Sequence, residues 1–521
     1  MNLMKHACTH ACFLILILVG APWQIRACST LLAGRDATTT GATMLSHSND
    51  GDGDVAGNCH VVAASSSPTS PRPVSRGTIP QVASTYQYFT EGYAIANEKQ
   101  VALGESTCTA VYGGTSDQQL NIVDLGQLCL ERSETARECI DVMGDLATTF
   151  GYYDAGESLM VIDPLEAWIF HVLPDSTGSS AIYVAQQIPP TNIASVMNAF
   201  VIRAVDLNDG GANFMYSSNL EEEATLLGWE GREAELDFSL LFSGENEATC
   251  KYSSGRRMWT VMNTFAPSLS ISPNYSTLLS ANYPTSFTPD FKVNSTSFRS
   301  MMRDTFEGTE FSLSGSLEPY APFSSASRWV TPQTVSNDTV CWERSISTYR
   351  SIVSFVAEAR GWLPDPVGGL IHFTPHSARA GLMLPLMVGM KSVTPSLSEN
   401  SLGTMNRGSS SFWGARVLYN LVELKSAYMI EDVRDFQRQV EDGFAVNLTQ
   451  YIELEYSSGT LAMSEAQVML NDFVEGQVQK LWDFGDTLLM NYADGYCSGC
   501  GRGPRHLGYP QVWLDAAYPP Q

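Results

Sequence analysis

The position with the clearest chemical potential in this sequence is Cys28, because of what lies on either side of it. A strand-like run, Ser29 to Ala33, begins directly after the cysteine, and a short secretory leader precedes it. Cleavage between Ala27 and Cys28 would place a thiol and a free α-amine on the same residue. A thiolate can attack a carbonyl carbon while the amine manages the proton, so this residue could perform nucleophilic catalysis.

Residues 1–27 have the parts of a signal peptide. Lys5 supplies positive charge, residues 12–19 form an apolar stretch too short to span a bilayer, and Ala27 suits the position before the cut. An uncleaved anchor and a bacterial lipoprotein are the alternatives, and Arg26 fits a lipidation site poorly. We expect removal of the leader and delivery of the mature chain to the outside or to a lysosomal or vacuolar lumen.

Sequons and cysteines support export. Four N-x-[ST] sequons predict glycans at Asn274, Asn294, Asn337 and Asn447. An even number of cysteines remains after the leader and Cys28 are set aside, which permits complete pairing, although several could be buried free thiols. They are Cys59, Cys108, Cys129, Cys139, Cys250, Cys341, Cys497 and Cys500. The last two are more typical of a disulfide than of a zinc or redox pair, because no second pair lies nearby.

Composition limits the partners of the chain. Its 521 residues are 44% hydrophobic and 16% charged, which supports a substantial core. A formal charge of −25 argues against binding to nucleic acid or to anionic lipid. No apolar run after the leader reaches the length of a membrane span, so the mature form is expected not to be membrane-spanning.

Two short strands should bring further polar groups back to Cys28. Ser29–Ala33, a Gly-containing turn and Ala42–Ser46 have the pattern of a hairpin, which returns His47–Asp50 to the starting end. Asp50 could then hold the α-ammonium of Cys28. Alternatively, Asp50 is a turn residue in an Asp/Gly-rich run. That run resembles part of a calcium loop but lacks the final glutamate, so no metal is predicted.

Other segments indicate an α+β protein. Gly92–Thr107 reads as strand, polar turn and strand, and the turn residue Asn97 is either a backbone former or an oxyanion donor. Thr135–Phe150 has the periodicity of an amphipathic helix, whereas Ala64–Pro80 is rich in Ser and Pro and predicts a surface loop. Helical patterns dominate after residue 410, over Phe412–Gln439 and Ser464–Met490.

An ordered set of motifs over most of residues 28–490 resembles peptidase family C69, which groups with the N-terminal nucleophile hydrolases, relatives of penicillin V acylase and secernin. The motifs are Cys28-Ser29-Thr30, His47–Asp50, Asn97–Thr107, Gly156-Glu157-Ser158, Asp163–Trp168, Ala185–Pro189 with Asn198, Arg360–Gly369 and Ser411–Trp413. The resemblance implies a four-layer αββα sandwich over 28–490, with C-terminal helices from about 410. Residues 491–521 would be a Cys/Gly/Pro-rich tail.

The resemblance also implies roles for individual residues. Cys28 would be the nucleophile with its α-amine as general base, Asp50 would bind that amine, and Asn97 and Asn198 would line the oxyanion hole. His47 falls where related acylases have an arginine near the thiol. Relatives use another arginine later in the chain, for which the sequence leaves Arg256, Arg257 and Arg350 open. Gln187 stands where an arginine is often found.

The expected activity is that of a cysteine dipeptidase acting on peptide substrates through a thioester on Cys28, without a cofactor. A hydrolase of non-peptide acyl-amides and a non-catalytic secernin-like interaction protein are the alternatives. A papain-like site using His372 or His376 is disfavoured, because the residues around Cys28 lack the papain context.

Overall fold

The two strands expected after Cys28 form a hairpin at the centre of the first sheet. In the computed structural model, β1 (Ser29–Ala33) pairs antiparallel with β2 (Thr43–Asp50). The sheet has the order β16-β14-β1-β2-β19-β20-β21, and its neighbouring strands are antiparallel. The added strands are β14 (Ile193–Val196), β16 (Ser286–Phe287), β19 (Ser351–Ala359), β20 (Gly369–Pro375) and β21 (Leu384–Met387).

The structure describes residues 28–51, 53–67, 69–244, 253–273, 283–314, 323–327, 333–335, 338–340, 343–498, 505–509 and 511–517. The expected signal peptide and the sequons at Asn274 and Asn337 lie outside these residues. Cys250, Cys341 and Cys500 also lie outside them.

A second antiparallel sheet packs against the first. Its order is β15-β13-β12-β11-β10-β9-β8-β3, and residues of β1 and β2 contact β10 and β11 across the interface. The strands are β3 (His60–Val62), β8 (Tyr88–Thr90), β9 (Ala94–Asn97), β10 (Ala102–Cys108), β11 (Gly156–Ile162), β12 (Ala167–Pro174), β13 (Ala181–Gln187) and β15 (Phe214–Tyr216). The strand–turn–strand prediction for Gly92–Thr107 is thus confirmed.

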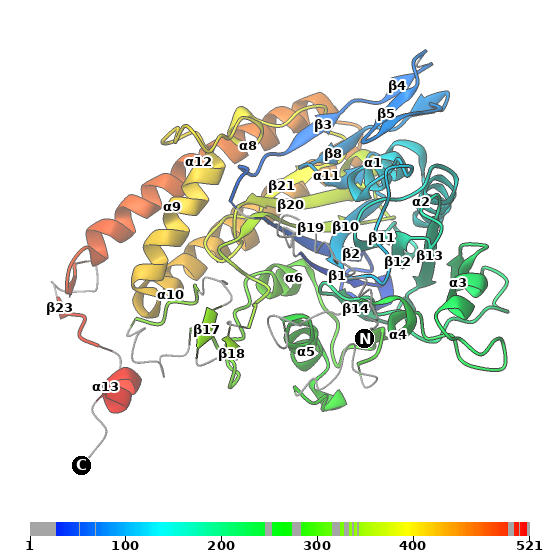
Figure 1. Ribbon diagram of the computed structural model, residues 1–521. Helices are drawn as coiled ribbons and strands as arrows, with labels where there is room; N and C mark the ends of the chain where they lie inside the picture. The colour runs from blue at the N-terminus through cyan, green and yellow to red at the C-terminus, as the bar shows by residue number, and fades with distance from the viewer. Residues whose placement is uncertain are drawn as a thin grey trace, which may run out of the picture.

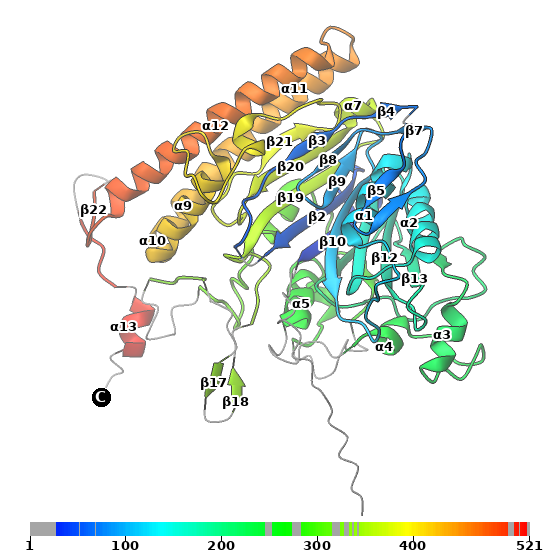
Figure 2. The ribbon, with the colours of Figure 1, turned by 45° about the horizontal axis from the view of Figure 1, so that its top comes forward.

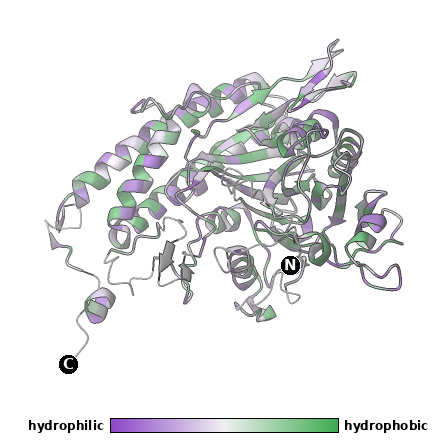
Figure 3. Cartoon of the chain, in the orientation of Figure 1, coloured by the Kyte–Doolittle hydropathy of each residue, from purple (hydrophilic) through white to green (hydrophobic). Residues whose placement is uncertain are grey.

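Strands of the second sheet are apolar on both faces because both faces are covered. On β11, Leu159 and Val161 join the cluster under α1 (Ile122–Arg132) and α2 (Ala136–Phe150). Met160 and Ile162, which alternate with them, join the core shared with the first sheet. The strands at the centre of Figure 3 accordingly carry much hydrophobic colour.

Helices lie on both sides of the paired sheets (Figure 1). α1 and α2 cover the second sheet, whereas α6 (Ser295–Met301), α9 (Ser411–Leu424) and α12 (Met463–Tyr492) contact strands of the first. In Figure 2 the C-terminal helices form a long layer beside β20 and β21. The remaining helices are α3 (Leu220–Leu226), α4 (Phe238–Phe242), α5 (Ser253–Phe265), α7 (Asp365–Gly368), α8 (Pro395–Ser398), α10 (Ser426–Arg438), a π-helix (Gln439–Ala445), α11 (Val446–Ser457) and α13 (Gln511–Ala517).

Helix boundaries follow local chemistry where the sequence carries it. The predicted helix Thr135–Phe150 is confirmed as α2, and Thr135 is its N-cap, accepting a hydrogen bond from the Glu138 backbone. The prediction of a single helix over Phe412–Gln439 is wrong. The helix is interrupted at Lys425, whose φ of −145° is not helical, so the segment forms α9 and α10.

The expected surface loop Ala64–Pro80 contains short strands. They are β4 (Ser65–Ser66), which pairs with β7 (Ser84–Thr85), and β5 (Arg72–Val74), which pairs with β6 (Gly77–Ile79). Two further small hairpins join β17 (Gln333–Val335) to β18 (Asp338–Val340) and β22 (Tyr496–Cys497) to β23 (Arg505–His506). Helices and antiparallel sheets together confirm the α+β class. Among the described residues, no helix has the length and apolarity needed to cross a membrane.

Cysteine pairing is only partial in the described part of the chain. Cys129 of α1 and Cys139 of α2 form a disulfide, and Cys497 is disulfide-bonded. Cys59 and Cys108 are buried free thiols, as is Cys28. The even cysteine count therefore does not translate into complete pairing.

Candidate active site

The hairpin brings the residues predicted around Cys28 together. Thr30 stands opposite His47 in the β1–β2 register, so the Asp50 end of β2 lies beside Cys28. The reactive atoms of Cys28, His47 and Glu105 all lie within 4.8 Å of one another, and all three side chains are buried. The sequence signals for Cys28 and the hairpin thus locate one buried polar cluster between the two sheets.

A glycine allows the two sheets to approach at this point. A Cβ atom on Gly104 would lie 2.9 Å from Thr30 Cγ2 and 3.0 Å from His47 Cβ, closer than van der Waals contact allows. Next to it, Thr30 Oγ1 donates a hydrogen bond to the Glu105 carbonyl oxygen at 2.7 Å. Gly104 therefore lets β10 carry Glu105 up to the hairpin that begins at Cys28.

The Cys28 thiol lies in surroundings that favour its protonated form. Burial raises its pKa well above the usual value, and the negative charges of Glu105 and Asp50 raise it further. Hydrogen bonding with the Asp50 backbone acts in the opposite direction but is the smaller effect. The site therefore favours the thiol over a permanently ionised thiolate, and any attack by this sulfur would need a base to remove its proton.

Glu105 and Glu157 form a buried carboxyl pair on neighbouring strands. Burial alone would raise the pKa of Glu105, but the nearby His47 and Glu157 side chains outweigh burial and lower that pKa. Burial raises the pKa of Glu157 well above the usual value, and the charge of Glu105 adds to the effect. The pair is therefore more readily ionised at Glu105 than at Glu157, beside His47 and Cys28.

Asp50 is fully buried at the end of β2. Its carboxylate accepts a hydrogen bond of 2.7 Å from Ser351 Oγ and pairs with the Arg344 guanidinium. The same arginine donates to Asn198 Oδ1 at 3.2 Å. Asp50 thus lies at the end of a strand near Cys28, as the hairpin predicted, and Arg344, which sequence reasoning did not single out, connects it to Asn198.

Asn198 also lies at the start of β1. Its backbone has a φ of 65°, a left-handed conformation that asparagine tolerates better than most residues. Its Nδ2 donates to the Thr107 carbonyl at 2.7 Å, and its backbone N–H donates to Ser106 Oγ at 2.9 Å. These bonds fix the amide group between β10 and Cys28.

Of the three arginines left open by the sequence, Arg257 reaches the cysteine. From α5, its Nη1 donates to the Cys28 carbonyl oxygen and to Ser29 Oγ, both at 2.9 Å, while Nη2 donates to Asn198 Oδ1 at 2.8 Å. Arg256 pairs with Glu343, and Arg350 Nε donates to the Gly51 carbonyl. Arg256 and Arg257 are adjacent on α5, but their guanidinium groups reach different partners, Glu343 and Cys28 respectively.

Asn97 is not brought to this cluster. It lies at the opposite end of the β9–β10 hairpin, where Nδ2 donates to the Leu130 and Ser133 carbonyls at 3.0 and 2.8 Å. Its Oδ1 accepts from the backbone N–H groups of Lys99 and Val101. Since each amide hydrogen is engaged in joining the turn to α1, the geometry favours the backbone role over the oxyanion role.

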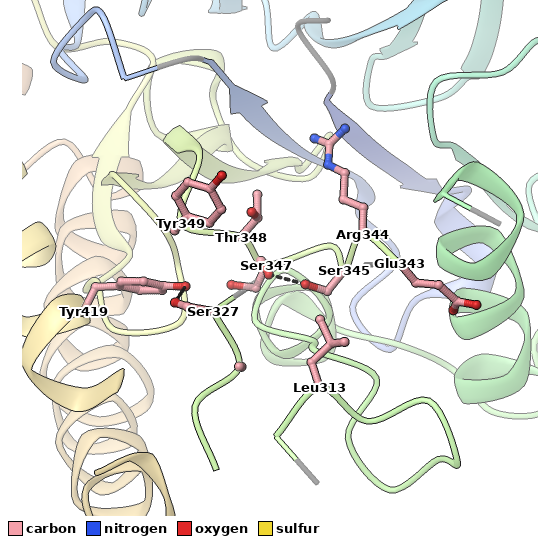
Figure 4. Close-up of a pocket in the computed structure, with 10 residues that line it drawn as sticks. Leu313, Ser327, Glu343, Arg344, Ser345, Ser347, Thr348, Tyr349 and Tyr419 are labelled. Carbon is pink, nitrogen blue, oxygen red and sulfur yellow. Dashed lines mark hydrogen bonds between the residues drawn. The ribbon is translucent and has the colours of Figure 1, made fainter. Parts of the chain in front are cut away.

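Gln187 also lies away from Cys28. It lines a pocket of about 260 Å³ with Gly34, Arg35, Glu166 and Pro190, beyond the far end of β1. A closer depression, of about 10 Å³, is lined by Arg344, Ser347, Tyr349 and Tyr419 (Figure 4). The Arg344 guanidinium extends from this lining toward Asp50, so the smaller depression borders the Cys28 cluster.

The other predicted positions are separate from the cluster. His372 and His376 are buried, and His372 Nε2 lies 2.9 Å from Glu358 within the first sheet. The sequon residues Asn294, which is the N-cap of α6, and Asn447 of α11 are both exposed. Exposure is compatible with a glycan, and glycosylation stays a prediction.

The structure thus places the Cys28 thiol among carboxylate, amide and guanidinium groups. Residues 27–439 match the sequence model of Peptidase family C69, so the chain belongs to this family and is a peptidase. It is 24% identical over 404 residues to a probable dipeptidase of Salmonella dublin, covering 73% of this chain and 85% of that protein. It is also 24% identical over 283 residues to a probable dipeptidase of Latilactobacillus sakei, covering 49% and 56% of the two chains.

Proposed function

We propose that the protein is a secreted or lysosomal-type cysteine dipeptidase whose nucleophile is an N-terminal Cys28. The convergence of Asp50, Asn198 and Arg257 on Cys28 is the observation that carries this proposal. The leader-like residues before Cys28 and the exposed sequons Asn294 and Asn447 support an exported glycoprotein. The names of the two related dipeptidases support the substrate class.

We further infer that the fold is the four-layer αββα sandwich of N-terminal nucleophile hydrolases. Two contacting antiparallel sheets, with α1 and α2 against one and α6, α9 and α12 against the other, support this assignment. In that arrangement the nucleophile stands at the start of a central strand, as Cys28 does before β1.

In the proposed reaction, the α-amine of Cys28 takes the thiol proton while sulfur attacks the peptide carbonyl. The raised pKa of the thiol makes such coupled transfer necessary, because little thiolate exists beforehand. Asp50 holds the resulting ammonium, and the Asn198 amide stabilises the oxyanion, a contribution of about 3 kcal/mol per donor. The ammonium proton passes to the departing amine, and water then hydrolyses the thioester to release the acyl group.

The remaining contacts position these groups. Arg257 fixes the Cys28 carbonyl and the Asn198 oxygen together, so the amide nitrogen of Asn198 is oriented toward β10. Arg344 restrains both Asp50 and Asn198. Preorganised dipoles of this kind lower the barrier because they need no reorientation during the reaction.

Trapping of the acyl-enzyme tests this function. Purified protein is mixed with a panel of dipeptides and acyl-amides and quenched in acid, and the intact mass is measured. The proposal predicts a mass increase equal to the N-terminal acyl residue of a dipeptide, located on Cys28 by fragmentation. A covalent adduct only with acyl-amides would favour the other hydrolase class, and no adduct or turnover with either panel would favour an interaction protein.

A further inference from the structure

Three metal-binding side chains meet at the start of β1. The thiol of Cys28, the imidazole of His47 and the carboxylate of Glu105 each offer a donor atom, and these atoms lie within 4.8 Å of one another. His47 Nε2 is 3.7 Å from Glu105 Oε2. Within the part of the chain that the structure describes, this is the one group of three such residues with converging donors.

The polar atoms of this group lack conventional partners. Both ring nitrogens of His47 and the Oε2 atom of Glu105 are buried without a hydrogen bond of normal length from any described residue. Buried polar atoms in folded proteins are nearly always satisfied. A cation at the centre of the group would satisfy these atoms.

We propose that Cys28, His47 and Glu105 form a binding site for a divalent transition-metal ion of the zinc type. Thiolate, imidazole and carboxylate are ligands of Zn²⁺, whereas Ca²⁺ and Mg²⁺ prefer oxygen alone. Zinc bonds of about 2.0–2.3 Å in a tetrahedron place donor atoms about 3.3–3.6 Å apart. The His47–Glu105 distance of 3.7 Å is close to that spacing, and the donor atoms, all within 4.8 Å of one another, would move closer together on binding.

Metal binding at this site has a defined chemical balance. The Cys28 thiol loses its proton to solvent and a sulfur–metal bond forms, with no change in oxidation state. A fourth position stays open to water or, in a chain that begins at Cys28, to its α-amine. Because the sulfur is then coordinated, it cannot attack a carbonyl, so the metal inhibits hydrolysis. This inhibition rests on the proposed function, whereas the binding itself does not.

Cobalt is the probe for binding, because a thiolate ligand gives Co²⁺ a charge-transfer absorption band. Metal-free protein is titrated with Co²⁺ under a non-thiol reductant, and Zn²⁺ is then added. The proposal predicts one Co²⁺ per chain, a thiolate band, and loss of the band when Zn²⁺ displaces cobalt. Absence of a thiolate band at saturating Co²⁺ would overturn the proposal.

Variants locate the ion. Cys28→Ser should remove the band, and His47→Gln and Glu105→Gln should each weaken Co²⁺ binding at least about tenfold, since loss of even an outer-shell partner costs that much. Cys59→Ser is the matched control, because Cys59 is another buried free cysteine outside the group. Unchanged affinity in both His47→Gln and Glu105→Gln, or loss of binding in Cys59→Ser, would contradict the assignment.

X-ray absorption of the zinc-loaded wild-type protein needs no variant and guards against folding defects. The proposal predicts one sulfur at about 2.3 Å and the other ligands as nitrogen or oxygen at about 2.0–2.2 Å; a shell without sulfur would refute it. Dipeptide hydrolysis is measured in parallel and should stop with Zn²⁺ and recover with a chelator. If no hydrolysis occurs but the cobalt and X-ray absorption spectra show the predicted sulfur ligand, the proposed function fails and the metal site stands. If hydrolysis occurs but no metal binds, the metal site fails and the proposed function stands.

Discussion

Two buried histidine–glutamate pairs in this protein differ in how well they are satisfied. His372 Nε2 lies 2.9 Å from Glu358, and Arg299 next to them pairs with Glu441 and Asp442. His47 Nε2 lies 3.7 Å from Glu105, and neither ring nitrogen has a hydrogen bond of normal length among the described residues. The first pair belongs to a network that holds α6 and the π-helix to the first sheet.

The two glutamates ionise alike, but their surroundings differ in charge. Burial opposes ionisation of both, and the neighbouring histidine lowers the pKa of each; Arg360 and Arg299 also lower that of Glu358, to about 2. Around Glu105, by contrast, further acidic groups gather, since the charges of Glu105 and Asp50 raise the pKa of Cys28 and that of Glu105 raises the pKa of Glu157. A satisfied buried network stabilises the fold, whereas the unsatisfied polar atoms beside Cys28 remain available to a ligand or a transition state.

The largest effect is expected at Cys28, the proposed nucleophile. Cys28→Ser should lower dipeptide turnover by at least about a thousandfold, as loss of a nucleophile does in other hydrolases. The thermal midpoint should change little, because serine is nearly isosteric. Cys59→Ser, the control, should retain activity. Turnover of the Cys28 variant near the wild-type rate would remove this residue from the mechanism.

Loss of the satisfied pair, His372 and Glu358, should lower the stability of the protein. Glu358→Gln removes the carboxylate that pairs with His372 and lies near Arg299 and Arg360, and breaking a buried pair typically costs about 3–5 kcal/mol of unfolding free energy. Urea unfolding measures this loss, and the turnover of the remaining folded fraction should be unaffected. A variant with wild-type stability would show that this network does not stabilise the fold.

Asp304, a buried carboxyl outside both pairs, should make the stability of the protein depend on pH. Burial raises the pKa of Asp304 to about 7, and the Glu307 charge adds to it, although the Phe306 N–H opposes the rise. The folded state then keeps a proton that the unfolded chain releases near pH 4, so stability falls as pH rises from about 4 to about 7. The unfolding free energy of Asp304→Asn, relative to that of the wild type, should therefore rise by on the order of 3 kcal/mol between pH 4 and pH 8. A pH-independent difference in urea unfolding would refute this.

The smallest stability effect is expected at the unsatisfied pair. Glu105→Gln preserves an acceptor for the Thr107 hydroxyl and removes a buried charge that faces Glu157 and Asp50. The unfolding free energy should therefore stay within about 1 kcal/mol of wild type. A loss as large as that of Glu358→Gln would erase the contrast between the two pairs.

Local signals in the sequence were sufficient for the hairpin, for α2 and for the α+β class. Residues 29–50 contain two strand-forming runs separated by turn residues, and Thr135 is of a residue type that caps helices. No Gly or Pro marks the break at Lys425 in the sequence. The apolar periodicity was the remaining signal, and it predicts one helix where the structure has α9 and α10. Asn97 had the right residue type, but local turn bonds use its amide.

The partners of Cys28 could only partly be predicted. Asp50 follows from the hairpin, whereas Arg257, Arg344 and Glu105 arrive from α5, from the segment before β19 and from the other sheet. Their positions depend on long-range packing, which spacing along the chain does not encode. Glu105 did lie in the Asn97–Thr107 motif, so its type was visible although its role was not.

N-terminal sequencing of the protein purified from expressing cells tests the central claim most directly. The account predicts that the mature chain begins at Cys28 with an unmodified α-amine, so that base and nucleophile share one residue. A mature chain that starts at another residue, or a blocked amine on Cys28, would contradict it.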